Sequence, residues 1–157
     1  MVLAVVLAAG LVGGCRTKET PPPGDIAVAL TALAAPTLAG PAFDPATLKG
    51  KPSLVLFVSP TCPHCVEELP AASKVAQAAN VGVVAVFIAG KAENAKGVIE
   101  HTGFQGTVLI DDGTLRTKYG VRAVPYTLVL GPDGTAREVL RGAHGEKRLA
   151  EAIADAR

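Results

Sequence analysis

Two cysteines separated by two residues are the part of this sequence best suited to chemistry. Cys62 and Cys65 enclose Pro63 and His64. Thiols at this spacing can be oxidised to a disulfide and reduced again without unwinding a helix. The reaction that such a pair supports is thiol–disulfide exchange, in which one thiolate attacks a disulfide and the second thiol resolves the intermediate.

The cysteine pair lies where a predicted strand meets a predicted helix. Residues 53–59 form a short apolar run rich in β-branched and aromatic side chains, which predicts a buried central strand ending at Pro60. Residues 62–80 are rich in Ala, Glu, Leu and Lys, with apolar residues at helical spacing, which predicts a helix. Free N–H groups and the helix dipole stabilise negative charge at that position, so we expect the thiolate of Cys62 to be favoured.

The four residues of this motif are the first candidate catalytic residues. Cys65, one turn further along the helix, is expected to be more buried and to act as the resolving thiol. Pro63 suits a first helical turn, where its missing N–H is not needed. His64, if protonated, adds positive charge beside Cys62, which stabilises the reduced form and makes the disulfide more oxidising. The alternative is a structural disulfide beside a solvated histidine.

The remaining pattern predicts a single α/β domain. Crossover helices imply parallel strands, and a tight turn at residues 131–134 implies an antiparallel hairpin. We therefore expect a mixed central sheet with helices on both faces. Further strands are predicted at 81–89, 107–110, 126–130 and 136–141, and further helices at 91–102, 115–119 and 145–157.

The N-terminus carries the pattern of an export signal. Residues 2–12 are almost continuously apolar, but this run is shorter than the roughly 20 residues that span a bilayer. Residues 11–15, Leu-Val-Gly-Gly-Cys, resemble a bacterial lipobox, which implies cleavage before Cys15 and lipidation of its sulfur. No Lys or Arg precedes the apolar run. The alternatives are a plain N-terminal anchor, or a cleaved signal with Cys15 unmodified.

Several segments resemble the thioredoxin superfamily. Residues 57–65 resemble its first core strand and active-site segment, and Pro70 matches the proline inside its first helix. Val124 and Pro125 resemble its cis-proline loop, which faces the cysteine pair and binds the substrate backbone. Without the resemblance, Pro125 could be an ordinary trans proline at a strand edge. The resemblance implies a thioredoxin-like fold and protein thiol–disulfide oxidoreductase activity.

Within the superfamily, the chain is most similar to the membrane-tethered periplasmic TlpA/ResA branch. Residues 43–52 and 111–121 resemble that branch's approaches to the first core strand and to the cis-proline. Glu68 matches a ResA-type glutamate proposed to tune cysteine protonation; the alternative is a solvated side chain. The branch implies protein disulfide or dithiol substrates, a membrane redox partner and a setting such as cytochrome c biogenesis.

Other positions depart from the family pattern. Thr61 stands where a tryptophan usually precedes the first cysteine, and Leu56 stands at the buried aspartate of cytoplasmic thioredoxins. The Pro-His dipeptide and the valine before the cis-proline resemble the oxidising DsbA type. The scaffold therefore indicates a reductant and the dipeptide an oxidant, and the direction of exchange stays open.

These patterns predict an organisation and a location. We expect a signal peptide at 1–14, a lipidated Cys15 with a proline-rich tether at 15–24, and a thioredoxin-like domain at 25–157. The protein would be a monomeric lipoprotein on the periplasmic side of the cell envelope, anchored to a membrane.

The composition and the isolated histidines argue against two other classes of function, nucleic-acid binding and metal binding. With a net charge of +1, the chain does not have the strongly basic surface that nucleic-acid-binding proteins use. No cofactor and no metal site are expected, because a structural zinc site needs a second ligand pair and His101 and His144 are isolated. The rival from another class is a copper-binding thioredoxin-fold chaperone, with Cys62, Cys65 and a histidine as ligands.

Overall fold

The computed structural model describes residues 37–38 and 43–157. The predicted signal peptide, the tether with Cys15 and residues 25–36 lie outside these residues. Within the described part of the chain, no helix is long and apolar enough to cross a membrane. Leu38 packs against the domain, and its N–H donates to the Val108 carbonyl at 3.4 Å.

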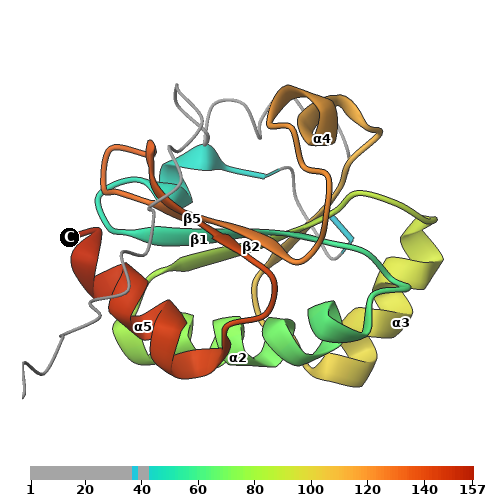
Figure 1. Cartoon of the computed structure of the whole chain (residues 1–157), viewed down its shortest axis with the longest axis horizontal. Coiled ribbons are helices and arrows are strands. Elements are labelled where there is room, and N and C mark those ends of the chain that lie inside the picture. Colours follow the sequence, from blue (N-terminus) through green and yellow to red (C-terminus); the bar gives the residue numbers. More distant parts are fainter. Residues whose placement is uncertain (1–36, 39–42) are drawn as a thin grey trace, which may run out of the picture.

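A mixed sheet forms the centre of the described domain (Figure 1). Its strands run in the order β3-β2-β1-β4-β5. The β1–β2 and β2–β3 pairs are parallel, and the β1–β4 and β4–β5 pairs are antiparallel. The predicted mixed sheet is therefore confirmed. The strands are β1 (Ser53–Val58), β2 (Gly82–Phe87), β3 (Thr107–Ile110), β4 (Tyr126–Leu130) and β5 (Ala136–Arg141).

Helices cover both faces of the sheet, as expected. Helices α2, α3 and α5 lie on one face, and the short helices η1 and α4 lie on the other (Figure 1). The helix boundaries differ from the predicted ones by one or two residues at most ends. The helices are η1 (Pro45–Leu48), α2 (Pro63–Ala79), α3 (Ala92–Thr102), α4 (Thr114–Lys118) and α5 (Gly145–Asp155).

The central strand β1 is buried on both faces, which explains its continuous apolar sequence. Leu54 and Leu56 face the core under α2 and α5, whereas Val55 and Phe57 face the core under η1 and α4. On the second face the Phe57 ring lies 5.8 Å from the Tyr126 ring, centroid to centroid, in an edge-on arrangement. Strand β1 is thereby fixed from both sides, and so is the loop that follows it.

Helix α2 is held against α5 by small and aliphatic side chains. Leu69 and Ala72 on α2 are fully buried in the same core as Leu149 and Ile153 on α5. The last helix, predicted at 145–157, is therefore confirmed and buries one apolar face. Pro70 lies inside α2, as the family pattern predicts.

Candidate active site

The Cys62 sulfur occupies the capping position of α2. Cys62 has an extended backbone, with φ −100° and ψ 110°, and Pro63 begins the helix. The Cys65 N–H donates to Cys62 Sγ at 3.3 Å. A capping atom accepts hydrogen bonds from otherwise unpaired N–H groups, and such bonds strengthen when the acceptor is an anion. The capping position of Cys62 is therefore confirmed, and the preference for its thiolate stays a prediction.

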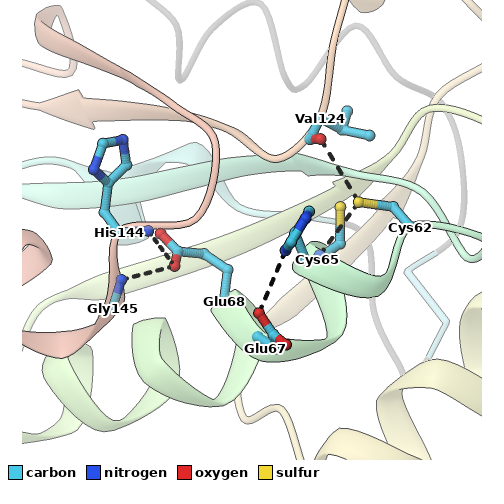
Figure 2. A network of polar contacts seen from close by, with 8 residues as sticks. Cys62, Cys65, Glu67, Glu68, Val124, His144 and Gly145 are labelled. Carbon is cyan, nitrogen blue, oxygen red and sulfur yellow. Dashed lines mark hydrogen bonds and ion pairs between the residues drawn. The ribbon is translucent and has the colours of Figure 1, made fainter.

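The loop before β4 faces the same sulfur. The Val124–Pro125 peptide bond is cis, as predicted, and the Cys62 thiol donates to the Val124 carbonyl at 3.6 Å (Figure 2). The two loops meet because β1 and β4 are antiparallel neighbours with Phe57 opposite Tyr126, one residue after Pro125. The sheet register therefore places the cysteine pair beside a loop whose carbonyl already contacts sulfur.

The two thiols have different surroundings. Cys62 is half-buried, whereas Cys65 is fully buried, and both are free in the structure. Burial raises the pKa of the Cys65 thiol to about 12, helped by the hydrogen bond with Cys62 and, to a smaller extent, by the Glu68 charge. Cys65 therefore stays protonated at neutral pH. The predicted difference in burial between the two thiols is confirmed.

Glu68 is buried, so the alternative of a solvated side chain is wrong. Its side chain is 1% exposed, and its Oε2 accepts hydrogen bonds from His144 N at 2.9 Å and Gly145 N at 3.0 Å (Figure 2). Its Oε1 is buried and has no hydrogen-bond partner among the described residues. Glu68 thus lies within electrostatic reach of Cys65 while binding the first N–H groups of α5.

Glu68 replaces the cap that α5 lacks in its own sequence. His144, at the capping position, makes no side-chain capping bond, so a carboxylate from α2 satisfies the helix N-terminus instead. We expect Glu68→Ala to lower the free energy of unfolding by about 2 kcal/mol, because two partly buried N–H donors lose their acceptor. Chemical denaturation measures the loss. Glu68→Gln retains an acceptor oxygen and serves as the matched control; equal losses in both variants would contradict the capping role.

His64 points away from the protein interior. Its side chain is 74% exposed, and its Nδ1 lies 3.5 Å from Glu67 Oε2. Any positive charge on His64 is shared with Glu67 and screened by solvent, which limits its effect on Cys62.

His101 and His144 do not form a cluster of potential metal ligands with the two cysteines in the part of the chain that the structure describes. His101 lies in the last turn of α3, and the His144 ring contacts the Arg141 carbonyl with Nε2 at 2.9 Å. In the described segments, no group of three or more His, Cys, Asp or Glu residues is arranged to hold a metal ion.

Two groups that organise the site were missed by the sequence reasoning. The backbone N–H groups of His144 and Gly145 carry no side-chain signal of their role. Asp111 is buried and accepts hydrogen bonds from Leu115 N at 3.0 Å and Arg116 N at 2.9 Å, which fixes the start of α4 before the cis-proline loop. An Asp-Asp-Gly turn ahead of a helix was the available signal for Asp111.

The chain is similar to known proteins over most of its length. A family model described as a thioredoxin-like domain matches residues 40–157. The soluble secreted antigen MPT53 of Mycobacterium tuberculosis is 34% identical over 138 residues, covering 86% of this chain and 78% of MPT53. The thiol:disulfide interchange protein DsbE of Pseudomonas aeruginosa is 32% identical over 113 residues, covering 69% of this chain and 61% of DsbE.

A solved structure gives the same result for the fold. A secreted disulfide oxidoreductase of Mycobacterium tuberculosis, described as homologous to Escherichia coli DsbE, superposes with a TM-score of 0.69 at 30% sequence identity. The alignment covers 77% of this chain and 93% of that one.

Proposed function

Because the chain belongs to the thioredoxin-like family of thiol–disulfide oxidoreductases, we propose that Cys62 and Cys65 exchange disulfides with proteins of the cell envelope. The main observation that supports this proposal is the position of Cys62 Sγ. It caps α2, accepts the Cys65 N–H and lies 3.6 Å from the Val124 carbonyl. A sulfur so placed is partly exposed, receives a hydrogen bond from the first turn of α2 and lies next to a loop that can hold a substrate.

The first step uses Cys62 as the nucleophile. Its thiolate attacks one sulfur of a substrate disulfide, the substrate S–S bond breaks, and the other substrate sulfur leaves as a thiolate that takes up a proton. A mixed disulfide between Cys62 and the substrate results. The backbone at Val124 and Pro125 aligns the substrate chain, because the carbonyl that contacts the thiol in the free protein can accept a substrate N–H instead.

The second step uses Cys65 as the resolving thiol. Cys65 gives up its proton and attacks Cys62 Sγ, the mixed disulfide breaks, and the second substrate thiolate leaves. The substrate has then gained two electrons, and Cys62 and Cys65 share a disulfide; the reverse sequence oxidises a substrate dithiol. The unpartnered Oε1 of Glu68 supports a role in receiving the Cys65 proton, since Cys65 senses this charge.

The different protonation of the two thiols can be tested by alkylation. At neutral pH we expect iodoacetamide to modify Cys62 and to spare Cys65, because the pKa of Cys65 is raised to about 12 and only thiolates react. Modification of Cys65 is expected to rise only as the pH approaches that value. Peptide mapping by mass spectrometry measures both sites, and equal modification at neutral pH would contradict the assigned roles.

Glu68→Gln tests the influence of the carboxylate on Cys65. Removing a negative charge that raises the pKa of Cys65 must lower that pKa, so Cys65 should ionise at lower pH. The thiolate absorbance is read in a Cys15→Ser, Cys62→Ser background, where Cys65 is the remaining thiol. An unchanged titration on adding Glu68→Gln would exclude electrostatic coupling between the two side chains.

We place the domain outside the cytoplasm, tethered by Cys15. Residues 1–14 would act as the signal peptide and residues 15–24 as the tether. The sequence Leu-Val-Gly-Gly-Cys supports lipidation of Cys15. One relative is named a soluble secreted antigen, which supports export of the domain. We expect palmitate incorporation in cells to be lost in Cys15→Ser and kept in Cys62→Ser, which leaves Cys15 in place. Equal labelling of the two variants would rule out Cys15 as the attachment site.

The direction of exchange is read from the reduction potential. Equilibration with glutathione gives this potential for the Cys62–Cys65 couple. A value close to about −270 mV, that of thioredoxin, identifies a reductant, and a value close to about −120 mV, that of DsbA, identifies an oxidant.

A further inference from the structure

A groove of about 510 Å³ opens beside the cysteine motif on the side of α3. The turn from β1 into α2 lies beside α3 (Figure 1), and residues of both segments line the groove. We call it the α3 groove. Its lining includes Thr61, Val66, Gly90, Glu93, Gly97 and His101.

The α3 groove adjoins the cysteine motif, because its lining includes residues on either side of Cys62 and Cys65 in the sequence. Thr61 directly precedes Cys62, with Cα atoms about 3.8 Å apart, and Val66 lies one turn into α2. Val124 contacts the Cys62 sulfur from another loop. A substrate chain that passes over the sulfur in extended form advances about 3.3 Å per residue. Its residues two or three positions from the reactive cysteine can therefore enter the groove.

Glycines keep the α3 groove open. A Cβ atom added at Gly97, in the middle of α3, would meet no atom within 4 Å. Gly90 has φ +86°, and a Cβ there would lie 3.0 Å from Pro60 Cγ, so glycine permits the close approach of the two walls. The accessible lining is mainly apolar, including Val66 and Val98. These features fit an apolar side chain of modest size.

Glu93 is the acidic residue among the described residues that line the α3 groove. Glu93 lies in the first turn of α3, and no ion pair joins it to another described residue. No Lys or Arg is among the described residues that line the groove, and His101 is the other titratable group there. A carboxylate without a partner at the mouth of a groove favours a basic group on the bound molecule.

We propose that the α3 groove is a substrate subsite that selects an apolar residue flanked by Lys or Arg, two or three positions from the reactive cysteine of a polypeptide substrate. This inference rests on the proposed function and adds a sequence preference to it. Thiol–disulfide exchange itself takes place at Cys62. The groove determines which polypeptide segments bind next to this cysteine.

Filling the groove tests the proposal. Gly97→Leu places a branched side chain in open space at a helical position where leucine is well tolerated. The measured quantity is kcat/KM for a peptide disulfide with the Leu-Lys pattern, divided by kcat/KM for hydroxyethyl disulfide, with dithiothreitol as the recycling reductant. We expect this ratio to fall roughly tenfold, the usual scale for blocking one apolar subsite.

Lys96→Leu is the matched control. It adds the same side chain to the same helix at an exposed position outside the lining of the groove, and we expect the ratio of the unmodified protein. A ratio that Gly97→Leu leaves unchanged, or that both variants lower equally, would overturn the subsite.

Reversing the charge at the rim provides an independent measurement. The unmodified protein should prefer a peptide with Lys over one with Glu at the flanking position by roughly threefold, and Glu93→Lys should invert this preference. Glu93 is exposed, so this variant does not depend on repacking. Equal preferences in both proteins would overturn the charge selection. An unmodified protein that turns over neither disulfide would refute the proposed function itself, and the subsite with it.

Discussion

Disulfide exchange is expected to fall by roughly 10⁴-fold or more in Cys62→Ser, the scale of loss when an enzyme's nucleophile is removed. Cys62 is the half-exposed thiol of the pair, and Cys65 is fully buried with its pKa raised to about 12. Burial, the largest cause of the raised pKa of Cys65, persists in this variant, so we expect that Cys65 does not take over as the attacking thiol at neutral pH. Turnover of hydroxyethyl disulfide by the purified protein, with dithiothreitol as reductant, measures the loss.

The serine substitution separates chemistry from folding. Serine is a favoured residue at a helix capping position, so the bond between position 62 and the Cys65 N–H should persist, and α2 should form as before. Cys15→Ser also removes one sulfur and is the matched control, which should retain full activity. Substantial exchange by Cys62→Ser would overturn the assignment of Cys62 as nucleophile.

Cys65→Ser is expected to stop the reaction halfway. The variant keeps the attacking thiol but lacks the group that breaks the mixed disulfide, so the Cys62–substrate adduct should accumulate to nearly one per protein molecule. Multiple turnover should fall by roughly 10²-fold or more, because release then depends on an external thiol. Intact-mass spectrometry under non-reducing conditions detects the adduct.

The double variant Cys62→Ser, Cys65→Ser completes this test. It should form no adduct, because the trapped bond involves Cys62. If Cys65→Ser turned over like the unmodified protein, or carried its adduct at Cys15, the division of roles between the two thiols would be wrong.

Local patterns were sufficient to predict the sheet and the cysteine pair. Strand β1 could be recognised because both of its faces are buried, so every position is apolar. The start of α2 could be recognised because Pro63 suits a first helical turn and a helix-forming composition follows it. Both signals lie within a few residues of each other in the chain. The cis-proline loop required the family resemblance, since the sequence alone did not fix the geometry of Pro125.

The environment of Glu68 could not be read from local patterns. Its hydrogen bonds reach His144 and Gly145, 76 and 77 residues away, and the partners are backbone groups. A glutamate in the early turns of a helix has the same local pattern whether it is solvated or buried. The α3 groove is similar, because the absence of a side chain at Gly97 becomes informative only once α3 lies beside the β1–α2 turn.

The Glu68 carboxylate links the C-terminal helix α5 to the proposed reactive cysteines. Glu68 is shared between the first turn of α5 and the neighbourhood of Cys65, so α5 is part of the electrostatic setting of the proposed resolving thiol. A fusion partner or truncation that loosened α5 would let water reach Glu68 and Cys65 together. Altered redox behaviour in such a derivative would then reflect a damaged C-terminal helix, although both cysteines remain intact.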